Sequence, residues 1–375
     1  MKKILFGTTA LLAAGAFVST AQASDPIKLS LGGYMEYWVA GANQDGDYAA
    51  PVNSFDIQGE SEVWFGGKTT LDNGMTIGVD VQLEAGSNNN NDDTIDESYL
   101  YLEGKYGKMI LGSENDAAYL MHVRAPDASQ MGGPWINTEG DTVQYLPTGT
   151  GVSGINTIND LLSDNNKVTY FTPKFYGVQL GASYTPSNNN SGDDAWANGV
   201  TNSENIGKAM DFDDAWSFGG TYAGSFSGVG VKASVGYVTM DINTPIANDA
   251  KDPVQEYSAG MAVSYQGFTV GGAAKRRVAN SASGMSATDG FAWNAGLMYA
   301  EGPYKVSYNY ASSEVEGAAT NAGEDTIHVH RIGGSYDLGP GVILFSELAY
   351  SSSKDEGADV NNGAYGGVVG LHLNF

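Results

Sequence analysis

Residues 75–85 read MTIGVDVQLEA, an unbroken alternation of apolar and polar side chains. Because successive side chains of a β-strand point to opposite faces, this period of two predicts a strand with one apolar and one polar face. The same alternation recurs along the chain, in segments that include 55–71, 216–226, 257–265, 291–299, 304–310 and 365–375. The chain is therefore expected to be all-β.

Sixteen strands are predicted, joined by two alternating kinds of connection. Connections after even-numbered strands are tiny, such as Ser227-Gly228 and Gln266-Gly267, whereas those after odd-numbered strands are long and polar, such as 185–213. All short turns then lie at one rim and all long loops at the other, which is typical of outer-membrane barrels. The predicted strands are 27–41, 54–71, 75–86, 94–105, 108–114, 167–173, 176–184, 214–226, 229–241, 255–266, 268–278, 290–300, 303–314, 326–338, 341–353 and 363–375. In 326–338 the apolar parity switches between Val329 and Ile332, which predicts a β-bulge there.

Aromatic residues recur at a spacing that fits a bilayer. Trp216 and Phe226 are ten residues apart, and Phe291 and Tyr299 are eight apart. With a rise of about 3.4 Å per residue and a tilt of about 40°, such pairs span roughly 21–26 Å, close to the apolar band of a membrane barrel. A soluble β-sandwich also alternates, but the aromatic spacing and the loop asymmetry together favour a membrane barrel.

The first 23 residues are predicted to be a secretory signal peptide. Lys2 and Lys3 precede an apolar stretch from Ile4 to Val18, and Ala21-Gln22-Ala23 supplies the small residues of a cleavage site. A retained membrane helix is the alternative, but about 15 apolar residues fall short of the ~20 that span a bilayer. Residues 24–375 are then the barrel domain, and a chain without spanning helices crosses a membrane only as a closed barrel.

Composition excludes several classes of function. The chain has no Cys, which rules out disulfides, CxxC zinc sites and a Cys nucleophile. Its formal net charge of −25 disfavours a nucleic-acid partner, because such binding needs Lys and Arg. We find no Walker P-loop, HExxH or nucleophile-elbow motif, so no enzyme is expected and no cofactor is implied.

Four segments resemble the general diffusion porins of Gram-negative bacteria. They are Leu29–Tyr34 (LSLGGY), Gly104–Gly112 (GKYGKMILG), Tyr170–Gly177 (YFTPKFYG) and the terminal Leu371–Phe375 (LHLNF). The resemblance implies a sixteen-stranded, homotrimeric barrel in the cell outer membrane. Its partners would be membrane lipid and lipopolysaccharide, and it would pass small hydrophilic solutes. It also implies that the long third loop, about residues 114–166, folds into the lumen; an external, solvated loop is the alternative.

The alternation of apolar and polar residues predicts which side chains line the channel. If apolar residues face lipid, alternation directs acids of the first three strands and bases of the eleventh strand into the lumen, on roughly opposite walls. We hypothesise a field across the pore and a weak cation preference, whereas the family implied by the resemblance usually sets a basic wall against acids on the loop. A polar lumen without such a field is the alternative. The candidate constriction residues are Glu36, Glu60, Glu62, Asp80, Glu84, Asp116, Arg124, Asp127, Lys275 and Arg277.

Acidic residues also collect in the long loops, for example Asp92 and Asp93, and Asp193 and Asp194. Such oxygen clusters suit Ca²⁺ or Mg²⁺, which could bridge the loops to lipopolysaccharide phosphates; solvated loops are the simpler interpretation. Alternatives to a general channel are a calcium-dependent adhesive or anchoring barrel, a substrate-specific channel, and a barrel hydrolase. His328 and His330 share one face of a strand and could bind a metal, although such pairs are more often plain surface residues.

Overall fold

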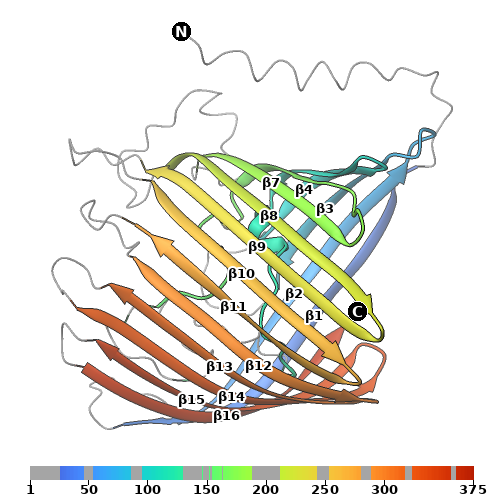
Figure 1. Ribbon diagram of the computed structural model, residues 1–375. Helices are drawn as coiled ribbons and strands as arrows, with labels where there is room; N and C mark the ends of the chain where they lie inside the picture. Colours follow the sequence, from blue (N-terminus) through green and yellow to red (C-terminus); the bar gives the residue numbers. More distant parts are fainter. Residues whose placement is uncertain are drawn as a thin grey trace.

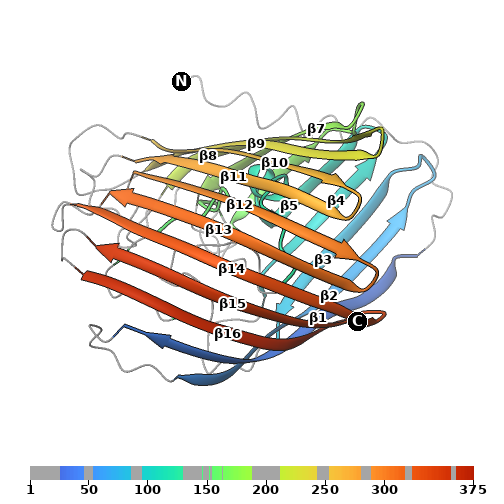
Figure 2. The same ribbon diagram turned by 60° about the horizontal axis from the view of Figure 1, so that its bottom comes forward.

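The computed structural model describes residues 26–45, 54–85, 95–129, 146, 152, 154–162, 164–187, 212–242, 253–279, 289–316, 323–355 and 360–375. Sixteen antiparallel strands form a closed barrel in which strands adjacent in sequence pair with one another and β1 pairs with β16 (Figures 1 and 2). The predicted signal peptide, 1–23, lies outside the described residues, as do the loop acids Asp92, Asp93, Asp193 and Asp194. The strands are β1 (Lys28–Gln44), β2 (Phe55–Thr70), β3 (Thr76–Glu84), β4 (Ser98–Gly104), β5 (Gly107–Ser113), β6 (Asn166–Phe171), β7 (Val178–Ser187), β8 (Phe212–Phe226), β9 (Val229–Ile242), β10 (Val254–Tyr265), β11 (Phe268–Val278), β12 (Gly290–Glu301), β13 (Tyr304–Glu316), β14 (Glu324–Gly339), β15 (Val342–Asp355) and β16 (Val360–Asn374).

The barrel closes where β1 pairs with β16. Tyr34 lies opposite Asn374 in this register, and Gly33 and Phe375 exchange two backbone hydrogen bonds of 3.0 and 3.1 Å. Closure leaves neither the first nor the last strand as a free edge of the sheet, which is the condition for a β-structure to stand in lipid.

The predicted strand number, order and short turns are confirmed. Two-residue turns join β8 to β9 and β10 to β11, where Gly228 and Gly267 have φ of 82° and 84° after residues that also have positive φ, as tight hairpins with the strand twist require. Strand ends differ by a few residues, and β3 to β6 are short, with only 9, 7, 7 and 6 residues.

The bulge predicted between Val329 and Ile332 is wrong. The register of β14 with β13 and β15 continues through these residues, and the irregularity lies at Asp337/Gly339. Val329 is instead an apolar residue on the inner face, where it packs in a buried cluster with Ile327, Leu146 and Val152. The parity switch arises because this part of the inner wall is covered by the chain and is therefore apolar.

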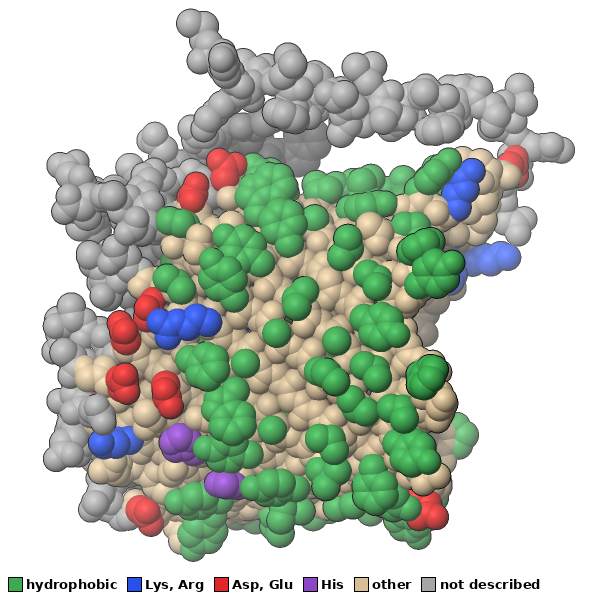
Figure 3. Space-filling view, viewed as in Figure 1, with side chains coloured by type: hydrophobic (Ala, Val, Ile, Leu, Met, Phe, Trp, Pro, Cys, Tyr) green, Lys and Arg blue, Asp and Glu red, His purple; other side chains and the backbone are tan. Residues whose placement is uncertain are grey.

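The outer face of the wall is apolar. Its exposed side chains include Leu31, Ile57, Phe218 and Leu348, and Figure 3 shows hydrophobic side chains spread over a band between charged rims. A globular protein in water would bury such residues, so the band indicates a hydrocarbon environment. No helix in the described part of the chain is long and apolar enough to cross a membrane.

Candidate functional site

The inner face of the barrel carries small polar and charged side chains. On β8, Trp216 and Phe218 are exposed on the outside, whereas Ser217 between them has no exposed surface. On β11, Lys275 is likewise fully buried, and its neighbour Arg276 is exposed on the outer face. Inner-wall residues of a wide barrel are buried only if something covers them. Here the covering chain is residues 114–129 and 154–162, between β5 and β6.

This covering segment begins with a short helix, α2 (Ala117–Leu120), capped by Asp116. Asp116 Oδ1 accepts hydrogen bonds from the backbone N–H of Ala118 (2.9 Å) and Tyr119 (3.2 Å), and from Ser217 Oγ (2.5 Å) on the wall. Burial raises the pKa of Asp116 to about 6, although these hydrogen bonds lower it. Asp116 therefore joins helix capping to attachment at the wall.

A series of side-chain acceptors on the wall binds the backbone of the covering segment. Backbone N–H groups donate to Ser or Asn side chains on β7, β8, β9, β12 and β13 over distances of 2.8–3.1 Å. Apart from the N–H of Ala118, which also donates to Asp116, a buried donor of irregular chain left without such an acceptor would cost about 1–3 kcal/mol. The pairs are Ala117 with Ser183, Ala118 with Ser217, Val123 with Ser234, Ala125 with Asn294, Ala128 with Ser307, and Ile155 with Ser313.

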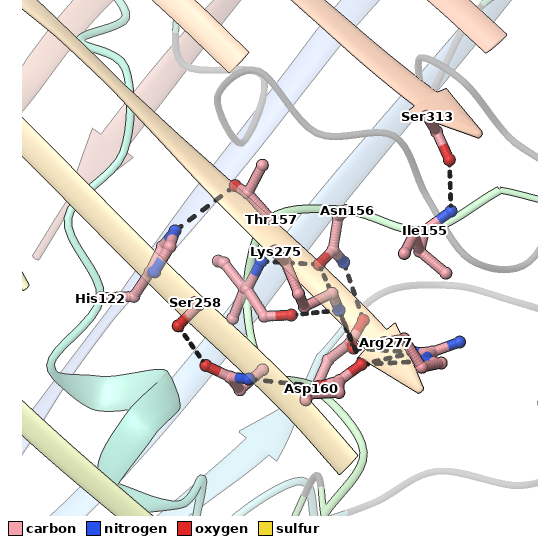
Figure 4. Close-up of polar contacts among 12 residues, drawn as sticks. His122, Ile155, Asn156, Thr157, Asp160, Ser258, Lys275, Arg277 and Ser313 are labelled. Carbon is pink, nitrogen blue, oxygen red and sulfur yellow. Dashed lines mark hydrogen bonds and ion pairs between the residues drawn. The ribbon is translucent and has the colours of Figure 1, made fainter. Parts of the chain in front are cut away.

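A buried charge cluster fastens the second half of the segment (Figure 4). Lys275 Nζ lies 2.9 Å from Asp160 Oδ1 and 3.0 Å from Glu256 Oε1, and it donates to the carbonyl of Ile158. Arg277 Nη2 lies 2.8 Å from Glu256 Oε1 and 3.5 Å from Asp160 Oδ1. Burial raises the pKa of Asp160, but the two cations outweigh it and hold that pKa below its usual value. Two bases and two acids thus neutralise one another.

A second buried cluster involves Asp127 of the segment. Arg331 Nη2 lies 2.5 Å from Glu347 Oε2 and 4.0 Å from Asp127 Oδ2. Ser129 Oγ lies within hydrogen-bond distance of both carboxylates, 2.9 Å from Asp127 Oδ2 and 2.6 Å from Glu347 Oε2, and its single O–H donates to one of them. Asn309 Nδ2 also donates to Asp127 Oδ1 at 3.2 Å. Asp127 is therefore held against β13 to β15.

The wall of β1 to β4 is acidic. Tyr34 Oη lies 3.2 Å from Glu60 Oε1 and 3.4 Å from Glu62 Oε1, within hydrogen-bond distance of both, and Trp64 Nε1 donates to Glu62 (2.7 Å). Glu36 lies 2.8 Å from His372 Nδ1 across the closing seam. The carboxyl groups of Glu62, Glu84 and Asp96, and those of Asp96, Glu97 and Asp164, lie within 4.8 Å of one another, so each trio could hold a cation.

Crowding changes the charge of one member of this wall. Glu97 lies just before β4 and is 8% exposed. Burial, followed by the neighbouring carboxylates Asp96, Asp164 and Glu114, raises the pKa of Glu97 to about 9. Glu97 is thus protonated at pH 7 and does not add to the negative charge.

His122 and Arg124 both belong to the first part of the covering segment, residues 114–129. His122 Nε2 lies 3.4 Å from Thr157 Oγ1. Burial, followed by the nearby Arg124 and Lys275, lowers the pKa of His122 to about 4, so the imidazole is neutral at pH 7. Burial also lowers the pKa of Arg124, which Tyr119 and Asp127 counteract.

The structure brings the predicted site residues into three groups. Glu36, Glu60, Glu62, Asp80 and Glu84 all share the inner face of β1 to β3. Lys275 and Arg277 lie on the inner face of β11, but as members of ion pairs. Asp116, Arg124 and Asp127 all lie on the covering segment, where Asp116 and Asp127 make wall contacts.

Sequence reasoning missed the partners. Glu256 and Glu347 occupy inner-face positions that strand parity could have identified, since both alternate with outward aromatic or aliphatic residues. The serine and asparagine acceptors carry no sequence signal beyond being polar on the inner face.

Comparison with known proteins agrees with this architecture. The family profile described as Gram-negative porin matches residues 7–356. An uncharacterized protein of Rickettsia conorii is 22% identical over 367 residues, covering 81% of each chain. Among solved structures, an anion-selective porin from Comamonas acidovorans superposes with a TM-score of 0.62 at 16% identity, covering 93% of this chain and 100% of the other. OmpT of Vibrio cholerae, described as a trimer form, gives a TM-score of 0.60 at 14% identity, covering 94% and 100%. Identities this low show a shared fold alone.

Proposed function

Because the chain belongs to the Gram-negative porin family, we propose that its barrel forms a water-filled channel for passive diffusion of ions and small hydrophilic solutes. The protein is an outer-membrane β-barrel, and family and fold point to a channel rather than an enzyme. The supporting observation is the reversal of ordinary burial: apolar side chains cover the outside, and charged and hydroxyl side chains cover the inside. Such a lumen replaces the hydration that lipid would remove from a solute.

The covering segment acts as the constriction of this channel. Support comes from its hydrogen bonds to five inner-wall strands and from its two buried charge clusters, which attach it at positions spread around the wall. A segment attached in this way narrows the lumen permanently, so the exclusion size follows from its position.

The channel prefers cations weakly. This proposal depends on the ion pairs of the opposite wall, where acids neutralise the charge of the bases. Glu256 and Asp160 neutralise Lys275 and Arg277 of β11, and Glu347 neutralises Arg331 of β14. On the wall formed by β1 to β3, the four carboxylates Glu60, Glu62, Asp80 and Glu84 outnumber the basic side chains of the same inner face. Because salt screens charge over about 8 Å, the selectivity reflects only carboxylates close to the narrowest point.

Reversal potentials across planar bilayers in a KCl gradient test this preference. We expect a cation-selective sign, and we expect Glu60→Gln with Glu62→Gln to shift the potential toward anions. The matched control is Glu314→Gln, which removes an exposed charge from the outer face and leaves the potential unchanged. An anion-selective wild type, or an unchanged double variant, would refute the acidic wall as the filter.

We further propose a homotrimer whose subunits meet through β1 to β6. The outer face of these strands is mostly aliphatic, with Leu29, Leu31, Ile57, Val79 and Leu100 exposed, whereas Trp, Tyr and Phe crowd the outer face of β8 to β15. Aromatic residues anchor at the membrane–water interface, so an aliphatic face fits protein contact better. Leu31→Lys with Ile57→Lys should convert the trimer into monomers in light-scattering measurements, and Val235→Lys with Val270→Lys on the far wall should not.

We also propose that divalent cations bind to acidic residues of this protein. Calcium or magnesium at the loop acids would support lipopolysaccharide bridging or adhesion. Of the described residues, the Glu62, Glu84 and Asp96 trio has the oxygen ligands that such ions prefer. A change in melting temperature with millimolar CaCl₂ that disappears in Glu84→Gln would assign an ion to this trio.

A further inference from the structure

Two histidines on the outer face of β14 have no role in the channel. His328 and His330 flank the inward-facing Val329, so both imidazoles project from the same outer face. Along this face Thr326 precedes them toward the loops, and Ile332 begins the exposed apolar part of the strand. The pair therefore lies at the border of the apolar band, within reach of water. Figure 3 shows histidine at this border, beside aromatic side chains.

Each imidazole is hydrogen-bonded through its Nδ1 atom to a tyrosine of β13. Tyr310 Oη lies 2.9 Å from His328 Nδ1, and Tyr308 Oη lies 2.9 Å from His330 Nδ1. Ser312 Oγ lies 3.2 Å from His328 Nδ1. The ring of Tyr310 also contacts both histidines, with centroid distances of 6.2 Å to His328 and 4.9 Å to His330. Among the described residues, the hydrogen bonds of both rings run through Nδ1.

We propose that His328 and His330 bind a divalent transition metal, Zn²⁺, Ni²⁺ or Cu²⁺, through their Nε2 atoms. Alternate residues of a strand lie about 6.8 Å apart on one face. Small rotations of the two rings bring both Nε2 atoms to the distance of about 2.0–2.1 Å at which imidazole binds a metal ion. These metals favour imidazole nitrogen, whereas Ca²⁺ and Mg²⁺ favour oxygen.

The tyrosine contacts match what metal-binding histidines need. A histidine that binds metal through Nε2 carries its proton on Nδ1 and donates it to a fixed oxygen, which sets the tautomer and the ring orientation. Tyr308 and Tyr310 supply that oxygen for one ring each. Water completes the coordination at this border, so the ion exchanges with solution.

Titration of the purified, detergent-solubilised full chain with ZnCl₂ by calorimetry tests the site. We expect one site in the wild type and at least tenfold weaker binding in His328→Gln and in His330→Gln. Tyr310→Phe, which keeps the ring and removes the hydroxyl, should weaken binding by about tenfold. The matched control is His372→Gln, whose imidazole bonds to Glu36 on the inner face and whose loss should leave zinc binding unchanged.

Copper supplies a second readout. The electron paramagnetic resonance spectrum of Cu²⁺ should show two coordinated imidazole nitrogens in the wild type and one in each single variant, which keeps the test decisive if the double variant fails to fold. A wild type that binds no zinc would overturn the proposal. Wild-type zinc affinity in His328→Gln/His330→Gln would also overturn it, because the metal would then lie on carboxylates.

Discussion

Lys275 Nζ lies 2.9 Å from Asp160 Oδ1, and the lysine side chain has no exposed surface. The contact joins strand β11 to the covering segment over a separation of 115 residues. Removing one member of a buried pair leaves the other charge uncompensated, so the contact fixes where the segment lies.

Lys275→Met should lower the free energy of unfolding by about 3–5 kcal/mol, because Glu256 and Asp160 would share Arg277 alone. Urea unfolding in detergent measures the change. The control is Arg276→Met, which breaks the exposed outer-face pair with Asp289 and should cost at most about 1 kcal/mol. Equal losses in the two variants would contradict a structural role for the buried cluster.

Asp116 should make stability depend on pH between about 4 and 6. Its pKa in the folded protein, about 6, lies above the ordinary value of 3.8, so its contribution is complete below pH 4 and is lost as the pH rises through 6. A difference of about two pKa units corresponds to roughly 3 kcal/mol.

Asp116→Asn removes this titration and keeps an acceptor oxygen for the helix cap. The difference in unfolding free energy between wild type and variant should therefore shift in favour of the variant from pH 4 to pH 7. A difference that stays constant over this range would show that Asp116 does not titrate there.

Ser217→Ala should cost about 1–3 kcal/mol, since it removes both the acceptor for Ala118 N–H and the donor to Asp116. Thermal unfolding compares it with Ser346→Ala, an exposed serine on the outer face of β15. The proposed constriction also predicts larger single-channel conductance in Ser217→Ala, because the covering segment loses an attachment. Unchanged stability together with unchanged conductance would show that the side-chain acceptors on the wall do not hold the covering segment in place.

Glu256→Gln should weaken the cation preference, because Lys275 and Arg277 would keep only Asp160 as a counter-charge. Reversal potentials in a KCl gradient measure the change, with Glu301→Gln at the short-turn rim as the control. If Glu256→Gln left the potential unaltered, the far wall would have no influence on selectivity.

Strand parity identified much of the wall and little of what covers it. It directed Glu60, Glu62 and Lys275 to the inner face, where the structure has them. It failed at Val329, because the rule that apolar residues face outward holds only where the inner face meets water. Val329 instead belongs to one buried apolar cluster with Leu146 and Val152 of the connection between β5 and β6.

The sequence by itself determined the sixteen strands, their order and most of the two faces of the wall, because alternation with a period of two is local and every strand pair except β1 with β16 joins strands adjacent in sequence. Only the tertiary structure decided that Asp160 neutralises Lys275, and that Ser313 receives the N–H of Ile155. Irregular chain has no periodicity that could encode its position. Its contacts depend on which donors and acceptors closure of the barrel brings within reach, over separations of 115 and 158 residues for these two pairs.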